Sequence, residues 1–465
     1  MYHFGSIAFA AIFAFIFNVT FSKVYNFETE GAIKNNNTEF VFNKNRDLLQ
    51  SLLDNLEPFD ELYIPNSTFH LNGGILVGDK DNNPLESNIW ALQHVRIVID
   101  GTLSFQNNRD LWPKASDDPD VERYVKGSNN LKSNQDVFDA FQFYTMDNVT
   151  FTSNKIGTFE GNGEAWWGYI NYLVHNTDRP KMMNMWRSRN ILWENLLLKD
   201  CPRWCFQARD VLNVEIRHSK IDCRRNDVDK HDIYNMGAFN TDGFDVAGKN
   251  VWMHHNEVWN DDDSFCVKQL TGANIFSQCA EDYIIENNRA SGIGLVIGSI
   301  GSKTSHTCVN NITFRDNYMH NTWKGIYVKS SPGQDLKGGT GMISNVLFQN
   351  ITIENPTQWP IWIGPQQASY DDSCSLLWPY ASNHCPVPWG MGFENITLRD
   401  IFVKGNTRYS PGVILGNSTN IMKGLMFDNV VVEKPFLHPW GEDYYYCHYA
   451  EGEYRRGTIP IQQKI

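Results

Sequence analysis

Two clusters of acidic residues carry the side chains best suited to chemistry in this chain of 465 residues. The first contains Asp242, two positions after Asn240, and the second contains Asp262 and Asp263. Neighbouring carboxyl groups can divide the work of a general acid and a general base, because like-charge repulsion keeps one of them protonated. A solvated acidic loop or a Ca²⁺ site would use the same residue types, so these alternatives stay open on spacing alone.

The elements that must position these carboxyl groups are predicted by a recurring phrase, in which Asn precedes alternating apolar and polar residues. Such alternation is typical of a strand with one buried face. Short strands that recur in this way indicate a solenoid, because stacked coils share a core that no single coil can form. Asn tolerates the left-handed backbone of a corner and can form a hydrogen-bonded ladder between coils. The clearest copies begin at Asn148, Asn190, Asn213, Asn250, Asn311, Asn345 and Asn395.

The pattern therefore predicts an all-β fold, a right-handed parallel β-helix. A β-sandwich is the alternative, and a leucine-rich repeat is disfavoured because its Leu spacing and helical half are missing. Asp242 and Asp263 are 21 residues apart, close to one coil, which places them on adjacent coils about 5 Å apart in height. Lateral offset of their loops would widen the gap to the roughly 6.5–9.5 Å that inverting glycoside hydrolysis needs.

We expect four segments along the chain: a signal peptide over 1–22, an N-terminal cap region over 23–90, a β-helix catalytic domain over 91–435 and a C-terminal tail over 436–465. The cap should contain an amphipathic helix that covers the open end of the stack. Its leucines on one helical face are Leu48, Leu49, Leu52, Leu53 and Leu56.

The apolar run from Ile7 to Phe17 predicts a secretory signal, since it is too short to span a bilayer. An oxidising destination agrees with 9 Cys, of which Cys374 and Cys385 are the favoured disulfide pair, with one Cys left over. We therefore expect a secreted, extracellular glycoprotein. The Asn-x-Ser/Thr glycosylation triplets begin at Asn36, Asn66, Asn148, Asn311, Asn350, Asn395 and Asn417.

The composition limits the partners of the chain. The net charge of −13 argues against a nucleic-acid binder, which would present a basic face, and no stretch after the signal predicts a membrane helix. Aromatic residues make up 13% of the chain, which suits either stacking on sugars or a Trp-rich core. Trp252 and Trp259, which flank the acidic strand, are candidates for either role. We expect a monomer whose partner is a polysaccharide.

Four motifs in the same order give the chain a specific resemblance to a known family. They are Asn240-Thr241-Asp242, Asp262-Asp263-Ser264, the glycine-rich stretch 292–301 and the stretch 325–329 ending in Lys329. With these motifs, and with similarity from about residue 66 to about residue 432, the chain resembles glycoside hydrolase family 28, the polygalacturonase family of right-handed parallel β-helices. Three positions depart from the family pattern: Ser264 stands in place of Cys, Ile293 in place of His and Tyr327 in place of Arg.

The resemblance implies inversion by a single displacement. Asp262 would be the general acid, and Asp242 and Asp263 would hold and deprotonate a water molecule. Neither a metal nor an organic cofactor is required. Asn240, Lys329 and Tyr327 would contact the substrate in this interpretation. Lys329 has an alternative role as an ion-pair partner of Asp263. His231 as a substitute for the missing family His is disfavoured.

We thus expect a secreted inverting glycoside hydrolase that cleaves a pectic, polygalacturonan-type polysaccharide or a related cell-wall polysaccharide. The alternatives are a polysaccharide lyase on the same fold and a non-catalytic carbohydrate-binding β-helix. Because Tyr327 cannot replace a bidentate Arg clamp on a uronate carboxylate, we also expect only weak activity on unbranched polygalacturonate.

Overall fold

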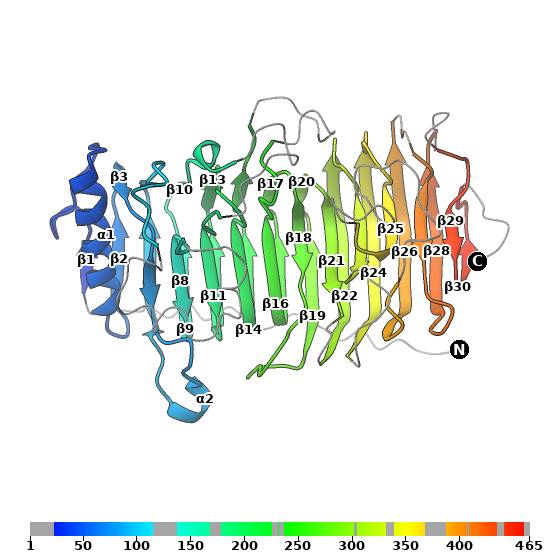
Figure 1. Cartoon of the computed structure of the whole chain (residues 1–465), viewed down its shortest axis with the longest axis horizontal. Helices are drawn as coiled ribbons and strands as arrows, with labels where there is room; N and C mark the ends of the chain where they lie inside the picture. The colour runs from blue at the N-terminus through cyan, green and yellow to red at the C-terminus, as the bar shows by residue number, and fades with distance from the viewer. Residues whose placement is uncertain are drawn as a thin grey trace.

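The computed structural model describes residues 23–114, 137–167, 178–225, 231, 237–301, 305–331, 339–367, 387–405, 407, 409–434 and 441–459. Within these residues, thirty strands form one continuous parallel sheet that coils into an elongated stack. Figure 1 shows the strands side by side along the long axis, with helix α1 (Glu39–Asp54) at the N-terminal end. The chain is a right-handed parallel β-helix, so the fold prediction is confirmed.

The pairing register sorts the strands into three rows that run along the stack. The first row, which we call the site face, consists of β4 (Ile75–Val77), β8 (Phe141–Tyr144), β11 (Met183–Trp186), the first part of β14 (Phe206–Arg217), the first part of β16 (Phe244–His254), β18 (Asp263–Val267), β21 (Gly294–Ile300), β23 (Ile326–Ser330), β25 (Ile361–Pro365), β27 (Gly412–Leu415) and β29 (Tyr446–His448).

The second row contains β1 (Val24–Asn26), β2 (Glu61–Ile64), β5 (Leu92–Gln93), β6 (Arg96–Ile99), β9 (Met146–Thr152), β12 (Arg189–Glu194), the later parts of β14 and β16, β19 (Cys279–Glu286), β22 (His306–His320), β24 (Thr340–Glu354), β26 (Met391–Lys404), β28 (Met422–Val432) and β30 (Ala450–Arg455). The third row contains β3 (Thr68–Leu71), β7 (Thr102–Phe105), β10 (Gly157–Glu160), β13 (Leu196–Lys199), β15 (Lys220–Asp222), β17 (Glu257–Trp259) and β20 (Arg289–Ser291), and it continues into the end of β22.

The corners between the first and second rows are formed by the Asn residues of the repeated phrase. Asn190, Asn213 and Asn250 have φ angles of 57°, 56° and 56°, the left-handed region that Asn tolerates better than most residues. Asn250 Nδ2 donates to Asn213 Oδ1 at 2.7 Å, and Asn213 Nδ2 donates to Asn190 Oδ1 at 2.9 Å. The predicted ladder is confirmed, and it fixes where each coil turns.

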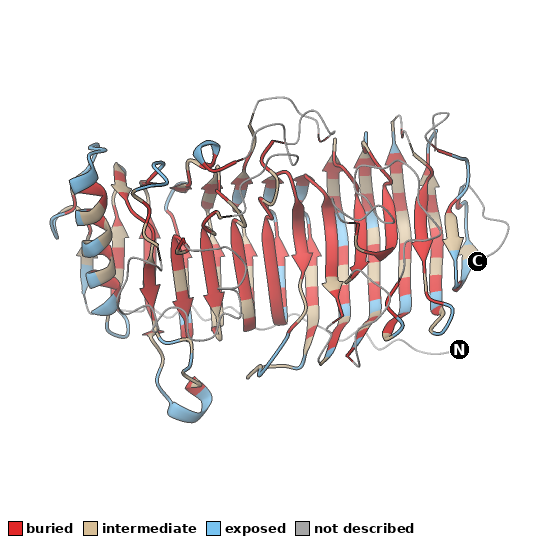
Figure 2. Ribbon diagram, in the orientation of Figure 1, coloured by how far each residue is buried: buried red, intermediate tan, exposed pale blue. Residues whose placement is uncertain are grey.

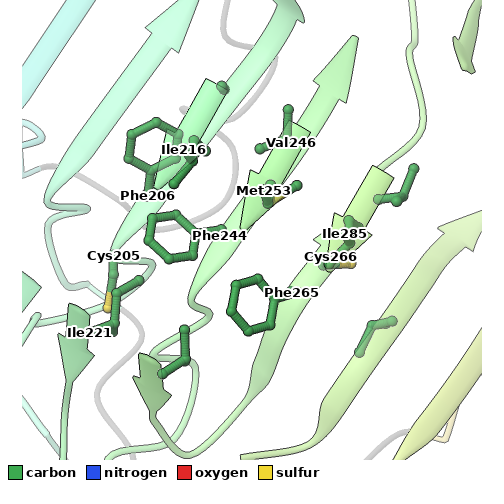
Figure 3. Close-up of a cluster of buried hydrophobic side chains, with 14 of the residues drawn as sticks. Cys205, Phe206, Ile216, Ile221, Phe244, Val246, Met253, Phe265, Cys266 and Ile285 are labelled. Carbon is green, nitrogen blue, oxygen red and sulfur yellow. The ribbon is translucent and has the colours of Figure 1, made fainter. Parts of the chain in front are cut away.

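Stacked apolar side chains fill the interior of the coil. Phe206, Phe244 and Phe265 come from equivalent positions on three successive coils, and their ring centroids lie 5.5 and 5.8 Å apart. Figure 3 shows these rings as one column, and Figure 2 shows that buried residues follow the strands through the whole stack. The column holds the three strands in register. The residues next to these rings along each strand point outward, and they are therefore held in register as well.

Helix α1 covers the N-terminal end of the stack, as the leucine pattern predicts. Leu49, Leu52 and Leu53 are buried in the core, and Leu48 and Leu56 are partly buried against it. The helix ends at Asp54, so Leu56 follows it. A second, short helix, α2 (Pro84–Ser87), and a 3-10 turn (Gly163–Ala165) lie between strands. Strands of the sheet also occupy parts of 23–90 and 436–465, and the boundaries of those two segments stay predictions.

The structure shows a disulfide that the sequence did not single out. Cys279 and Cys308 are bonded across the paired strands β19 and β22. The predicted pair of Cys374 and Cys385 lies outside the described residues, as does the signal segment 1–22. In the part of the chain that is described, no helix is long and apolar enough to cross a membrane.

Candidate active site

The two acidic clusters meet on the site face, as their spacing predicts. β16 pairs with β18 in a register that joins Phe244 to Phe265, so Asp242 and Asp263 occupy equivalent positions on adjacent coils. Asp262 immediately precedes β18. One carboxylate oxygen from each of the three aspartates lies within 4.8 Å of the others. This limit concerns the nearest oxygens, so the gap of about 6.5–9.5 Å between whole carboxyl groups stays a prediction.

Backbone hydrogen bonds hold the two loops together. Gly243 N donates to the carbonyl of Asp263 at 2.7 Å. Asn260 Nδ2 donates to the carbonyls of Thr241 and Asp263 at 2.8 and 2.9 Å, and Ser264 Oγ donates to Asn260 Oδ1 at 3.1 Å. The Ser that replaces the family Cys thus takes part in fixing the loop that carries the carboxylates.

Asp262 is held as a buried acid. Its Oδ1 accepts from the backbone N–H of Asp263 at 2.8 Å, and its Oδ2 accepts from Asn240 Nδ2 at 3.3 Å. Arg179 donates in turn to Asn240 Oδ1 at 3.3 Å. Burial, reinforced by repulsion from Asp242 and Asp263, raises the pKa of Asp262 well above its usual value. The structure therefore places Asn240 against the acid.

Asp263 has the opposite character, because two ammonium groups contact it. Lys329 Nζ lies 2.9 Å from both of its oxygens, and Lys268 Nζ lies 3.0 Å from Oδ2. Burial alone would raise the pKa of Asp263, but these two cations outweigh it and lower the pKa. Two adjacent carboxyl groups thus have pKa values shifted in opposite directions, which is typical of an acid and a base that work together.

Lys268 also neutralises the other carboxyl groups of the site. Its Nζ lies 3.4 Å from Asp242 Oδ2 and 3.3 Å from Asp245 Oδ1. Burial raises the pKa of Asp242, with Lys268 opposing it, and burial raises the pKa of Asp245 to about 8. Lys268 was not among the residues predicted for the site. Its position directly after β18, the strand that begins at Asp263, was the available signal.

Lys329 reaches Asp263 from β23 by crossing β21. A Cβ on Gly298, in the intervening strand, would lie 2.9 Å from Lys329 Cγ and 2.2 Å from its carbonyl oxygen. Gly298 also has a φ of +119°. The glycine-rich stretch is therefore required to let the lysine pass over the strand, and the alternative role of Lys329 as partner of Asp263 is seen in the structure.

Tyr327 lies in the same row as Asp245 but is only 2% exposed. Its hydroxyl accepts from the backbone N–H of Gln367 at 2.8 Å. The ammonium groups of Lys329 and Lys324 lie 4.7 and 5.2 Å from its ring centroid. Because its ring is covered, Tyr327 does not offer a stacking surface for a sugar. The predicted contact between Tyr327 and the substrate is not supported by this burial and stays a prediction.

A group of cations and aromatic rings, which we call the cationic group, lies on the coils that precede the carboxylates. It consists of Lys181, Arg203 and Arg209 with the rings of Trp186 and Trp204. Lys181 and Arg203 each lie 4.8 Å from the Trp204 ring, and Arg209 lies 5.4 Å from the Trp186 ring. Burial and repulsion from the two arginines lower the pKa of Lys181 to about 8. This group was not predicted from the sequence, because its members come from separate coils of the β-helix.

The tryptophans singled out from the sequence lie elsewhere. Trp252 is 41% exposed, but it lies in the second row, beyond the corner at Asn250, where its Nε1 donates to Glu286. Trp259 lies in the third row, with Arg224 3.6 Å above its ring. Both residues therefore belong to rows other than the site face.

His231 does not replace the missing family His in this arrangement. Its Nδ1 pairs with Asp261 at 2.9 Å and its Nε2 with Ser291 Oγ at 2.8 Å, which occupies both ring nitrogens. Asp261 in turn accepts from the backbone N–H groups of residues 237 and 238. Ile293, at the family His position, is buried and contributes its N–H to the carbonyl of Asp262.

Comparisons with known proteins identify the family and the fold of the chain. The sequence profile of glycosyl hydrolases family 28 matches residues 81–444. A polygalacturonase of Fusarium fujikuroi is 30% identical over 213 residues, which are 45% of this chain and 53% of that protein. An exopolygalacturonase of Cochliobolus carbonum is 23% identical over 82% of this chain and 78% of its own length.

The same fold occurs in an exopolygalacturonase from Thermotoga maritima. The TM-score is 0.63 at 15% identity, with 94% of this chain and 93% of the other covered.

Proposed function

Since the chain belongs to glycosyl hydrolase family 28, we propose that it hydrolyses glycosidic bonds in a pectic cell-wall polysaccharide, with Asp262 as general acid. The observation that carries the proposal is the contrast between two adjacent buried carboxyl groups: two ammonium groups contact Asp263, which lowers its pKa, whereas burial near other carboxyl groups raises the pKa of Asp262. An acid that stays protonated beside a base that stays ionised is the arrangement that hydrolysis requires.

In the proposed reaction Asp262 donates its proton to the glycosidic oxygen as the bond to the leaving sugar breaks. Asp263, together with Asp242, orients a water molecule and accepts its proton as it attacks the anomeric carbon. Asp242 Oδ1 is buried and accepts no hydrogen bond from the described residues, which suits a contact with that water. Lys268 opposes the effect of burial on Asp242 and, with Lys329, lowers the pKa of Asp263, so Asp263 is the member of the pair that acts as the base.

Inversion of the anomeric carbon is what the family resemblance implies. One oxygen from each of the three aspartates lies within 4.8 Å of the others, and such a distance between the nearest oxygens is compatible with either stereochemical class. A free carboxylate nucleophile would be needed for retention, however, and Lys329 and Lys268 engage both oxygens of Asp263. Proton NMR of the first products, recorded before mutarotation, distinguishes the two: we expect the inverted anomer.

The cationic group indicates a substrate that carries carboxylates. Charge-assisted hydrogen bonds from arginine are well suited to a uronate group, and the Trp204 and Trp186 rings offer surfaces for sugars. On the opposite side of the carboxylates, Lys329 is paired with Asp263 and Tyr327 is covered. We therefore propose a uronate on the side of the cationic group and a neutral sugar beyond Asp263, as in a pectic backbone of mixed composition.

The test compares initial rates of reducing-sugar release from polygalacturonate and from a pectic backbone that alternates uronate and neutral sugars. We expect at least tenfold preference for the alternating backbone, since losing a charge-assisted clamp costs about 1.5–3 kcal/mol. A preference for polygalacturonate would overturn the substrate proposal but leave hydrolysis intact. Absorbance of unsaturated products would instead indicate a lyase, and no product from either polymer would indicate a binding protein.

Secretion and a monomeric state complete the proposal. Segment 1–22 supports the first, and N-terminal sequencing of protein from the culture medium of a eukaryotic host should begin near Lys23. Size-exclusion chromatography with light scattering should give the mass of one chain.

A further inference from the structure

Three cysteines outside the carboxylate site lie together behind it. Cys201 and Cys205 belong to the segment between β13 and β14, and Cys223 directly follows β15. All three are fully buried. The sulfurs of Cys205 and Cys223 are 3.4 Å apart, the backbone N–H of Cys201 donates to the sulfur of Cys223 at 3.1 Å, and one sulfur from each lies within 4.8 Å of the others.

These thiols contact the loop that carries a catalytic carboxylate. The backbone N–H of Cys205 donates to the carbonyl of Asp242 at 2.8 Å, and its sulfur lies 3.8 Å from the carbonyl of Thr241. Figure 3 shows Cys205 beside Phe206 and Ile221, at the edge of the packed interior. The start of β14 and the end of β15 therefore lie close to each other, next to the loop that contains Asp242.

We propose that Cys205 and Cys223 are joined by a disulfide in the mature protein, and that Cys201 is a third thiol held within exchange distance. In its formation, two thiols and one molecule of a disulfide oxidant give the Cys205–Cys223 disulfide and two thiols of the reduced oxidant. Because the sulfurs are fully buried, the oxidant must react before this coil closes during folding. The bond would then be shielded from reductants.

The geometry favours a disulfide over a metal site. Two thiolates that share a tetrahedral zinc ion, each about 2.3 Å from it, lie about 3.8 Å apart, whereas the observed separation of Cys205 and Cys223 is 3.4 Å, near van der Waals contact. Chemistry points the same way. Although burial opposes it, hydrogen bonds from Cys201 and Cys205 lower the pKa of Cys223 to about 7, which favours the thiolate that attacks a disulfide.

Peptide mapping of the full chain, secreted from a eukaryotic host, tests the bond directly. Free thiols are alkylated in denaturant without reductant before digestion with trypsin. Cleavage after Lys199, Arg203, Arg209, Lys220 and Arg224 places the three cysteines on separate peptides, 200–203, 204–209 and 221–224. We expect 204–209 linked to 221–224, and 200–203 alkylated. Alkylation of all three, a link through Cys201, or bound metal at one equivalent that zinc chelation removes would overturn the proposal.

A second measurement remains informative where a variant folds poorly. The melting temperature should fall by about 5 °C when the protein is fully reduced in denaturant and refolded under reducing conditions, because a cross-link restricts the unfolded chain. Oxidised Cys223→Ser should melt below oxidised wild type, and the fall that reduction still causes in this variant comes from the Cys279–Cys308 bond. The matched control, Cys279→Ser with Cys308→Ser, should keep the reductant-dependent difference. A Cys223→Ser protein that melts within about 1 °C of oxidised wild type would contradict the bond, and Cys201→Ser should retain it.

Discussion

The two sides of the active site use their positive charges differently. On the side of β18 and β23, Lys329 and Lys268 contact Asp263 at 2.9 and 3.0 Å. On the side of β11 and β14, the cationic group contacts aromatic rings, and Lys181 donates to the amide oxygen of Gln207 at 3.2 Å.

In the proposed function, the first set controls the protonation of the reacting groups and the second set binds the substrate chain. A buried ammonium that already faces a carboxylate gains little from a substrate carboxylate, whereas a cation over an aromatic ring is not committed to a carboxylate in this way. In this proposal, the loss of the family Arg at Tyr327 weakens uronate recognition on one side only. Substitutions on each side should therefore separate chemistry from recognition.

Asp262→Asn should have the largest effect, because it removes the proton that the leaving oxygen needs. We expect the rate of reducing-sugar release to fall by about 10²–10⁴-fold, with the melting temperature unchanged. Asp282→Asn, at a corner on the second row, is the matched control and should stay within about twofold of wild type. If Asp262→Asn kept a tenth or more of the wild-type rate, Asp262 would not be the general acid.

Lys268→Met should come next, because it removes the charge that touches Asp242, Asp245 and Asp263. In wild type, activity needs Asp263 ionised and Asp262 protonated, so the pH profile should be bell-shaped. The acid limb follows Asp263, whose pKa is lowered, and the basic limb follows Asp262, whose pKa is raised. Without the ammonium the pKa of Asp263 rises, and the acid limb should move to higher pH as the maximum falls about tenfold or more.

Two control variants sharpen this result. Lys268→Arg keeps the charge and should hold the acid limb near its wild-type position. Lys249→Met removes an exposed lysine that pairs with Glu281 on the second row, and its profile should match wild type. An acid limb that stays in place in Lys268→Met would mean that Lys329 alone sets the ionisation of Asp263.

Arg209→Gln tests the other side and should act on substrate binding. We expect kcat/KM on a uronate-containing polymer to fall by about tenfold or more, since a hydrogen bond to a charged group contributes about 1.5–3 kcal/mol. The limbs of the pH profile should not move. Arg217→Gln, which loses contacts to Glu194 and Glu215 on the second row, provides the control. A shift of the pH-profile limbs with unchanged kcat/KM would contradict this separation, because it would show that Arg209 affects the ionisation of the carboxyl groups and not substrate binding.

Trp252→Ala should have the smallest effect. The ring is exposed, but the corner at Asn250 separates it from the site face. Rates on either polymer should remain within about twofold of wild type. A marked rise in KM would show that the substrate wraps around the coil to the second row.

The fold was predictable from the sequence because the same local pattern recurs in successive coils of the β-helix. Each Asn corner and each alternating strand is a local feature, and the offset of 21 residues between Asp242 and Asp263 translates directly into adjacent coils. The separation of the carboxylates was not predictable in this way, because it depends on how the two loops align in register.

The contacts of long side chains that reach from one coil to another also could not be predicted from the sequence. Lys268 reaches three carboxyl groups, and Lys329 reaches Asp263 only because Gly298 leaves the path open. The members of the cationic group are separated by as much as a coil along the chain, and no periodic pattern marks them. Residue spacing predicts which side chains share a row, but it does not predict where their charged ends meet.

The helix at the N-terminal end of the stack has a consequence for how molecules meet one another. A parallel stack ends in a strand with unpaired N–H and C=O groups above an open apolar interior, and such an edge accepts another strand. Helix α1 packs on β3 and β4 and buries Leu49, Leu52 and Leu53 there. The helix therefore covers the apolar interior at this end, and we expect this cover to prevent a second molecule from adding its strands to the stack there.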